Sequence, residues 1–582
     1  MTYRTPLSDI LKTLHHVTNL DALAAEGLFP GFALDLVEPI LSEAGRFVSE
    51  RIAPLNRDAD KIGARLVDGA VITVPGWQEA YRDWRDAGWN ALPGPAEHGG
   101  QGLPVLLNSA CVEMWNAGSL AFGLAPLLTM GAVEALSAHG SNALKATFLD
   151  KLVAGIWTGT MNLTEPQAGS DLAALKTRAE RASDGSYRIF GQKIYITYGD
   201  HDLADNIIHL VLARLPDAPA GTRGISLFVV PKFLVNADGS LGPRNDLHCH
   251  ALERKLGIHG SPTCTMIYGD RGGAIGYLVG EENRGLACMF TMMNNARLAV
   301  GLQGVALAER ATQQAIAYAK ERRQGRAAGH EGPGMAPIVL HPDVRRMLLE
   351  MRVKTIAARG LCYQVAEAID RAHAGHTAED RAMAEARASL LTPVAKAFAT
   401  DISVEVASIG VQVHGGMGFV EETGAAQHLR DARILPIYEG TNGIQAIDLV
   451  TRKLPVQGGA VVRSFIGELR LKATDAGRSS AALARPSARI LRTIDVLETA
   501  TSWMLAAVAS QPGDALAGAT AYLRLFALAA SGVNLLREAS GTGDSADVEK
   551  VAFFASQLAS AAEGLAEAAT AGAESLGSAA IA

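Results

Sequence analysis

The spacing of apolar residues changes along this 582-residue chain, and that change constrains the fold more than any other feature. Up to about residue 160, apolar residues recur every three or four positions, which predicts helices. From about 160 to 280 the repeat becomes two, as in 186–197 and 207–214, which predicts strands. Helical spacing then returns and continues to the end. Because helices and strands do not alternate, the pattern argues against a doubly wound α/β sheet.

These blocks predict an α+β multidomain protein. It would comprise an N-terminal helical domain, a central antiparallel β-barrel or sandwich, a C-terminal four-helix-bundle domain and an appended helical domain. The expected boundaries are an N-terminal arm at 1–34 and domains at 35–158, 159–281, 282–455 and 456–582. The spacing predicts long helices over 296–321, 342–374 and 380–413, and a loop over 325–337.

The composition bears on whether the protein binds nucleic acid, inserts in a membrane or forms disulfides. Hydrophobic residues make up 48% of the chain and charged residues 19%, which is typical of a folded globular protein. A net charge of −7 gives no basic excess, so no nucleic-acid partner is expected. No run of 18 apolar residues occurs, so no stable membrane insertion is expected. Five widely spaced cysteines without a CxxC pair, and a start without a signal-peptide pattern, predict reduced thiols and a cytoplasmic location.

Two glycine-containing segments are candidates for cofactor binding. The segment 164–171 (TEPQAGSD) lies where helices give way to strands, and its hydroxyl groups and backbone N–H groups suit a polar ring or a phosphate. An ordinary turn is the alternative. The segment 412–419 (QVHGGMGF) has paired glycines, which allow close approach of the backbone to an anion. It lacks the spacing and preceding strand of a dinucleotide fingerprint, so a simple helix end is the alternative.

A third segment, 429–441, places Glu439 in a setting that suits a general base. Glu439 follows Ile437 and Tyr438, and desolvation by such neighbours raises the pKa of a carboxyl group. The alternative is an acidic residue that caps the helix expected from Thr441. The sequence His248-Cys249-His250 contains possible metal ligands, but neighbours on a strand point to opposite faces and no second cluster completes a site. No metal is therefore expected, and the absence of a GxSxG motif leaves a serine hydrolase unsupported.

Together, the three segments in this order resemble the acyl-CoA dehydrogenase family over about residues 35–455. Supporting motifs are Gly99-Gly100-Gln101-Gly102, Gly191-Gln192-Lys193, Arg297 after 292–296 (MMNNA), and 321–324 (ERRQ). The part after 455 resembles the extension of the longer members, among them the very-long-chain enzymes and the 3-methylmercaptopropionyl-CoA dehydrogenases. The segments 255–263, 321–326 and 341–346 are most similar to the methylmercaptopropionyl branch.

The resemblance implies FAD-dependent α,β-dehydrogenation of an acyl-CoA thioester to a trans-2-enoyl-CoA. Glu439 would take the α-proton while the β-hydride passes to flavin N5, and the Glu439 backbone N–H and a ribityl hydroxyl would polarise the thioester oxygen. In some branches the base lies directly before the arginine that matches Arg297. That position is Ala296 here, so Glu439 is the favoured base. The substrate would be 3-methylmercaptopropionyl-CoA or a fatty acyl-CoA.

The resemblance also assigns binding residues and partners. Cofactor contacts fall on Met161, Thr164, Ser170, Tyr195, Thr197, Arg322, Gln412, Gly415, Gly416 and Thr441; substrate contacts fall on Ser170, Asn294, Arg297 and Gly440. Arg322 and the 412–416 segment would contact FAD of a neighbouring subunit, which implies a homo-oligomer, and the extension favours a dimer over a tetramer. Electron-transfer flavoprotein would accept the electrons. Tyr195, Met161 and Gly325 depart from the family pattern, which usually has tryptophan, an aromatic residue and phenylalanine there.

Three other functions stay open from the sequence. An acyl-CoA oxidase would use the same fold but pass electrons to oxygen. A non-catalytic family member would act as a binding or assembly protein through the C-terminal helices, although the retained Glu439 argues against this. A nitroalkane oxidase is disfavoured because that group has aspartate at the position of Glu439.

Overall fold

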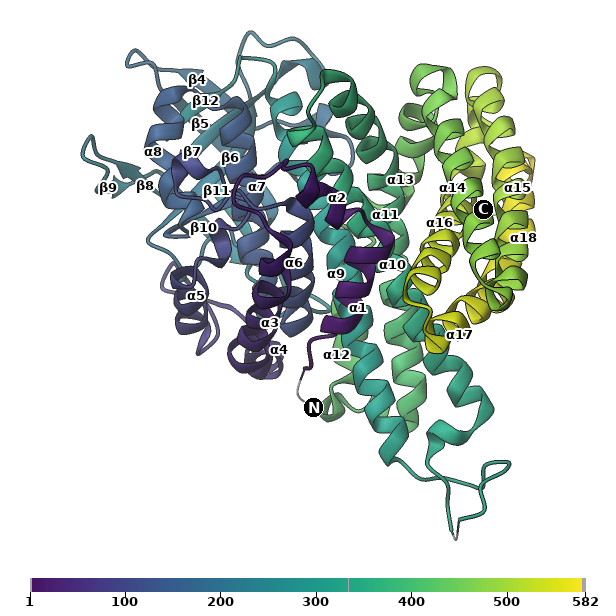
Figure 1. Cartoon of the computed structure of the whole chain (residues 1–582). Coiled ribbons are helices and arrows are strands. Elements are labelled where there is room, and N and C mark those ends of the chain that lie inside the picture. The colour runs from purple at the N-terminus through teal and green to yellow at the C-terminus, as the bar shows by residue number, and fades with distance from the viewer. Residues whose placement is uncertain (1–2, 333, 578–582) are drawn as a thin grey trace. The chain divides into compact units, whose positions relative to one another are not determined.

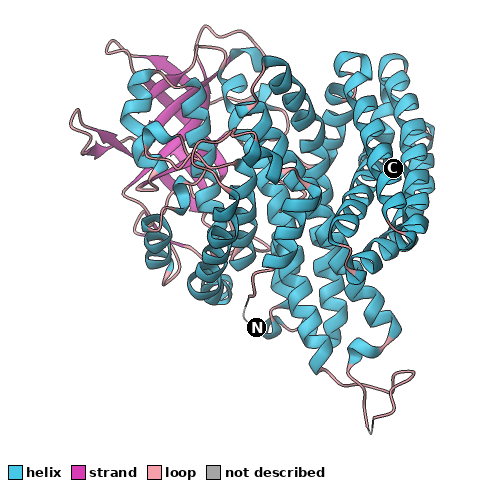
Figure 2. Ribbon diagram, in the orientation of Figure 1, coloured by secondary structure: helices cyan, strands magenta, loops and turns pink. Residues whose placement is uncertain are grey.

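A computed structural model describes residues 3–332 and 334–577. The chain divides into two compact units. Figure 1 labels their helices and strands. One unit comprises residues 47–104 and 118–299, and the other comprises 1–46, 105–117 and 300–582. Figure 2 shows that the strands gather in one part of the chain while the rest is helical. This arrangement agrees with the predicted α+β class of helical, β-barrel, helical and appended helical domains.

The first of these units, which we call the barrel unit, contains the β-sheet. Its helices are α4 (Asn56–Ile62), α5 (Trp77–Asp86), α7 (Leu120–His139), α8 (Asn142–Val153) and the first part of α9 (Gly285–Glu321). Its strands are β1 (Arg65–Val67), β2 (Ala70–Ile72), β3 (Trp157–Asn162), β4 (Arg178–Arg181), β5 (Tyr187–Thr197), β6 (Asn206–Arg214), β7 (Ile225–Pro231), β8 (Phe233–Val235), β9 (Leu241–Arg244), β10 (Leu247–Leu252), β11 (Thr263–Tyr268) and β12 (Ala274–Val279).

The main sheet has eight strands in the order β10-β11-β5-β12-β7-β6-β3, with β4 paired to β5 and β6. Most pairs are antiparallel, as predicted, but β3 runs parallel to β6 and so does the short β4. The predicted antiparallel barrel or sandwich is confirmed, with these two parallel pairings as exceptions. Alternation within a strand does not encode the direction of its partner. The β1–β2 hairpin, whose register pairs Leu66 with Val71, also interrupts the segment predicted as wholly helical.

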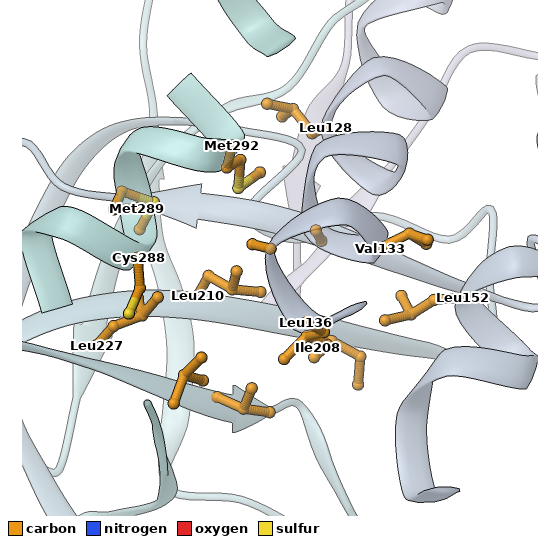
Figure 3. Close-up of a cluster of buried hydrophobic side chains, with 14 of the residues drawn as sticks. Leu128, Val133, Leu136, Leu152, Ile208, Leu210, Leu227, Cys288, Met289 and Met292 are labelled. Carbon is orange, nitrogen blue, oxygen red and sulfur yellow. The ribbon is translucent and has the colours of Figure 1, made fainter. Parts of the chain in front are cut away.

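The core of the barrel unit lies where α7, α8 and the start of α9 cover one side of the sheet. Figure 3 shows Leu136, Ile208 and Met289 among the side chains that meet there. Every second residue of β6 and β7 contributes to this cluster, as expected for strands with one face against helices. Burial of this apolar face holds β3, the strand that leads into segment 164–171.

The second unit, which we call the helical unit, is built from long helices. They are α1 (Leu7–Lys12), α2 (Leu20–Ala25), α3 (Val37–Phe47), α6 (Val105–Gly118), the rest of α9, α10 (Pro342–Ala374), α11 (Ala378–His414), α12 (Ala425–Ala432), α13 (Asn442–Asp448), α14 (Ala460–Ser479), α15 (Ala481–Ser510), α16 (Pro512–Thr542), α17 (Ser545–Phe553) and α18 (Ala562–Thr570). The spacing predicted α10 at its observed bounds and α11 to within two residues at its start. Short π-helical turns follow α1 and α13 at Thr13–Val17 and Leu449–Lys453.

A buried ion cluster joins the central helices of the helical unit. Arg359 on α10 is fully buried and pairs with Glu113 of α6 at 2.7 Å and with Glu309 of α9 at 3.1 Å. A buried charge is tolerated only when it is paired and hydrogen-bonded, so these contacts fix which faces of α6, α9 and α10 meet.

The appended helices are part of the helical unit. Helix α16 packs against α10, α13, α14, α15 and α18, and residues 522–536 are almost entirely buried. Arg524 of α16 reaches Glu405 of α11 at 2.9 Å. The N-terminal residues also contact the appended helices: Lys12 pairs with Asp547 at 2.8 Å and Thr13 donates a hydrogen bond to Glu538.

Two helices, α7 and α16, are long and apolar enough by length and composition to cross a membrane. In this structure 89% and 72% of those apolar windows are buried inside the protein, as in core helices. The five cysteines are free and buried.

Candidate functional site

A buried ion pair anchors the loop of segment 164–171 in the barrel unit. Glu165 accepts hydrogen bonds from Lys193 Nζ at 2.8 Å, from Thr177 Oγ1 at 2.6 Å and from the Lys176 backbone at 2.7 Å. Burial raises the pKa of Glu165, but the charge and hydrogen bond of Lys193 outweigh it and hold the pKa at about 2. Lys193 also donates to the Leu163 carbonyl at 2.9 Å. The loop is therefore tied to strand β5.

Five of the predicted cofactor residues lie around this ion pair. Met161 is near the end of β3 opposite Leu210, and the carbonyl of Thr164 accepts the Ile194 backbone N–H at 2.9 Å. Ser170 is exposed on the loop. Tyr195 has a left-handed φ of 59° and a side chain exposed to 60%, and Thr197 lies two residues on, opposite Thr263.

This arrangement fits a flat, polar ring. A large aromatic side chain exposed to 60% on a barrel is unusual, because burying such a ring is strongly favourable. Tyr195 offers a face for stacking, and the loop that carries Thr164 and Ser170 supplies hydroxyl groups. The barrel unit thus presents a surface whose chemistry suits the isoalloxazine ring of FAD.

The predicted substrate residues of the barrel unit lie on the first turns of α9. Asn294 is exposed, whereas Arg297 is only 8% exposed. Between them, Asn295 donates to Glu134 of α7 at 2.5 Å. Burial raises the pKa of Glu134 to about 7, against the opposing effect of the Asn295 hydrogen bond. The two predicted residues therefore differ in their surroundings, and the sequence did not single out Glu134.

The helical unit holds Glu439 in a tight turn just before α13. Glu439 and Gly440 both have left-handed φ angles, of 56° and 84°. Thr441 is the N-cap of α13 and its Oγ1 accepts the Ile444 N–H at 3.3 Å. The interpretation of Glu439 as the cap of this helix is therefore wrong, because a threonine hydroxyl already fills that role. The Gln445 side chain donates to the carbonyls of Glu439 and Gly440, both at 3.2 Å.

Tyr438, the neighbour of Glu439, is fixed by a chain of side-chain hydrogen bonds. Its hydroxyl donates to Gln303 of α9, whose amide donates to Asn116 at 3.2 Å. Burial raises the pKa of Tyr438 well above its usual range, and the charge of Glu439 raises it further. Tyr438 therefore stays protonated, and its ring lies in the field of the Glu439 carboxylate.

The remaining predicted cofactor residues gather at the ends of α9 and α11. The rings of Tyr318 and His414 stack with centroids 4.4 Å apart, which brings these two helix ends together. Arg322, Gln412, Gly415 and Gly416 are exposed near this stack. Gly415 has a φ of 61° and ends α11, so the helix-end interpretation of segment 412–419 is confirmed. Beyond it, Phe419 is 88% exposed and Met417 49%.

The sequence analysis did not identify Lys396, a buried lysine, as part of the site. Lys396 of α11 is fully buried and donates to the Gly440 carbonyl and to Asn442 Oδ1, both at 2.9 Å. The available signal was a single lysine inside the apolar stretch 393–399 of an expected helix, a position where charge is rare unless it is paired. Within the described ranges 3–332 and 334–577, no group of three His, Cys, Asp or Glu side chains could hold a metal ion.

Comparison with known protein families gives matches along most of the chain. Residues 37–156, 160–270 and 283–454 match the N-terminal, middle and C-terminal domains described for acyl-CoA dehydrogenases. Residues 462–579 match the domain described as acetyl-CoA dehydrogenase C-terminal like. These matches span both units and the extension.

Three known proteins illustrate the similarity. The chain is 48% identical over 535 residues, 92% of its length and 90% of the other, to a 3-methylmercaptopropionyl-CoA dehydrogenase of Ruegeria pomeroyi. It shares its fold with Caenorhabditis elegans ACDH-11 in complex with C11-CoA, at a TM-score of 0.77 and 21% identity over 96% of this chain and 91% of that one. A chain from a study of the electron transferring flavoprotein of Acidaminococcus fermentans is 27% identical, with a TM-score of 0.58 over 72% of this chain and 98% of that one.

Proposed function

This chain belongs to the acyl-CoA dehydrogenase family, and we propose that it converts 3-methylmercaptopropionyl-CoA to the corresponding trans-2-enoyl-CoA, with Glu439 as the base. Acyl-CoA dehydrogenase activity and the use of FAD follow from membership of the family. The observation that supports this particular substrate is the 48% identity to the Ruegeria enzyme, which extends through 92% of the chain.

The proposed base is suited to its role by its position. Glu439 is half-buried and follows Tyr438, whose hydroxyl is held by Gln303 of α9. An α-proton beside a thioester is weakly acidic, so a base that is partly desolvated and held in one orientation is required. In the reaction, the α C–H bond breaks as its proton passes to the Glu439 carboxylate, and a carbon–carbon double bond forms as the β C–H bond is lost.

FAD, when bound, supplies the acceptor for the hydride that leaves the β-carbon. In the barrel unit Tyr195 would stack on its ring while Thr164 and Ser170 would contact its polar edge. In the helical unit Thr441 would contact the cofactor. Arg322, Gln412, Gly415 and Gly416, which are exposed, would contact FAD of a second subunit, and the exposed Phe419 follows them in the chain. Exposed apolar residues beside a charged anion-binding group are typical of an interface, and a homodimer is part of the proposal.

The remaining partners follow from the chemistry. Reduced flavin must be reoxidised, and we assign this step to electron-transfer flavoprotein. The similarity to the Acidaminococcus chain supports that assignment. Asn294 and Arg297 would contact the acyl-CoA. A cytoplasmic location is also proposed, supported by five buried free cysteines.

The experiment that tests the proposal is anaerobic bleaching of the flavin by a panel of thioesters. The purified holoenzyme would be mixed with butyryl-, octanoyl-, palmitoyl- and 3-methylmercaptopropionyl-CoA while its visible absorbance is followed. We expect the fastest bleaching with 3-methylmercaptopropionyl-CoA. Faster bleaching with another member would contradict the proposed substrate. Hydrogen peroxide released in air in proportion to substrate consumed would replace the flavoprotein acceptor with oxygen.

A further inference from the structure

A buried lysine holds the turn that carries the proposed base. Lys396 Nζ lies 2.9 Å from the carbonyl oxygen of Gly440, the residue that follows Glu439, and 2.9 Å from Asn442 Oδ1. Lys396 has no exposed surface. A buried ammonium group loses its hydration, so it is retained only where its hydrogen bonds replace that hydration. Here, two of those bonds go to the backbone turn and the first residue of α13.

That turn needs external support. Glu439 has a φ of 56°, a region that residues with a side chain rarely adopt, and Gly440 continues the turn at 84°. Such strained backbone persists only where surrounding groups fix it. Two side chains do so from different helices: Lys396 on α11 binds the Gly440 carbonyl, and Gln445 on α13 binds the carbonyls of both residues.

The lysine is also connected to the start of α13. Asn442, which accepts the Lys396 hydrogen bond, donates to Asp401 Oδ1 at 2.7 Å and to Thr400 Oγ1 at 3.0 Å. Burial raises the pKa of Asp401, while the Asn442 hydrogen bond and the charges of Arg524 and Lys396 oppose the rise. Lys396 and Asp401 both belong to α11, so one helix holds the turn through its ammonium group and holds Asn442 through its carboxylate.

We propose that Lys396 is a positioning residue for the dehydrogenation: it fixes the Glu439–Gly440 turn and so sets the orientation of the Glu439 carboxylate toward the α-carbon. The inference rests on the proposed role of Glu439 as the base. It predicts a specific defect, because most of the residues assigned to FAD and thioester binding lie outside this turn. Loss of Lys396 should slow proton abstraction far more than it weakens binding.

Exchange of α-deuterium isolates this step. Ethylthioacetyl-CoA has the chain length of 3-methylmercaptopropionyl-CoA, but its third position is sulfur and carries no C–H bond. With this thioester, the α C–D bond can break and reform with solvent hydrogen while no hydride can leave. Mass spectrometry of the deuterated compound, incubated with FAD-loaded enzyme in ordinary water, would therefore report proton abstraction alone.

The test compares Lys396→Met, Lys396→Arg and a control, Lys354→Met. Lys354 is another largely buried lysine of the helical unit, and its ion pairs are with Glu350 and Glu405. We expect Lys396→Met to slow deuterium loss by about 10- to 100-fold, the scale of a misplaced catalytic group, with KM and FAD content changed less than about threefold. Lys396→Arg, which keeps the cation, should recover part of the rate. The control should exchange at the wild-type rate.

A wild-type rate in FAD-loaded Lys396→Met would overturn the inference and leave the proposed function intact. Absence of exchange by the wild-type enzyme, together with no bleaching by any thioester, would overturn both. If Lys396→Met does not fold, Asn442→Ala removes one partner of the lysine and keeps its charge. That variant should slow exchange about 3- to 10-fold if the turn positions the base, and unchanged exchange would again contradict the inference.

Discussion

The ammonium nitrogen of Lys193 lies 2.8 Å from a carboxylate oxygen of Glu165, and both side chains are buried. The pair joins the loop of Thr164 and Ser170 to the strand of Tyr195. Glu165→Gln keeps the shape of the side chain but leaves the lysine charge buried without its counterion, so we expect a loss of about 3–5 kcal/mol in stability. We also expect weaker FAD binding. Thermal unfolding and flavin titration would measure the two effects.

Two further variants test whether the effect comes from the buried pair. Adding Lys193→Met to Glu165→Gln removes the uncompensated charge, so the double variant should be more stable than Glu165→Gln alone. Glu180→Gln breaks an exposed pair with Arg178 in the same unit and should change stability by less than about 1 kcal/mol. Equal stability of Glu165→Gln and Glu180→Gln would show that the buried pair does not hold the loop.

Glu439→Gln should keep FAD but lose at least about 100-fold in the rate of flavin reduction, as expected when a general base is removed. Glutamine has the same size and cannot accept the α-proton. The rate would be measured by stopped-flow absorbance with the best thioester of the panel, and the visible spectrum would confirm cofactor content. Near-normal reduction would exclude Glu439 as the base.

Glu134→Gln should change how stability depends on pH. The pKa of Glu134 is raised from 4.5 to about 7 by burial. Between those values the unfolded chain releases a proton that the folded protein retains, so folding stability falls as pH rises through this range. The loss is complete above about pH 7 and amounts to about 3–4 kcal/mol. Glutamine can still accept the Asn295 hydrogen bond and carries no charge.

We therefore expect Glu134→Gln to melt higher than the wild type at pH 8 and at about the same temperature at pH 5. Differential scanning fluorimetry at both values would measure this, with Glu180→Gln as the matched surface control. If the melting temperatures of wild type and Glu134→Gln differed by the same amount at both pH values, the assignment of a buried, protonated carboxyl group would be refuted.

A chain ending at residue 455 should not accumulate as folded protein. Removal of the appended helices would expose the faces of α10 and α13 that pack on α16 and would leave Glu405 without Arg524. The full chain, prepared in parallel, serves as the control. Soluble yield and size-exclusion chromatography would measure the outcome. A stable, active protein ending at 455 would instead identify the extension as a separable binding module.

Much of the fold could be predicted because hydrophobic periodicity is a local property of the sequence. It gave the bounds of α10 and the end of α11 at a glycine. Thr441 could be predicted as the start of a helix because threonine is a common N-cap. The parallel pairing of β3 with β6 could not, since the direction of a partner strand depends on how the chain returns.

The supporting residues of the candidate site could not be predicted either. Lys396 and Gly440 are separated by 44 residues, and Gln303 and Tyr438 by 135, so nothing near either residue signals the contact. The left-handed turn at Glu439 was also unexpected, because only glycine, asparagine and aspartate signal that conformation with any strength. The chemistry of the site is carried by short motifs, whereas its rigidity comes from contacts that form only after folding.

The contact between Lys12 and Asp547 has a consequence for how the chain is made. During synthesis the ribosome releases the N-terminus first, and domains fold as their residues emerge. All residues of the barrel unit have been made once residue 299 has been added. Helix α1 can make this contact only after residue 547 has been added, so a helix made early in synthesis completes its packing late.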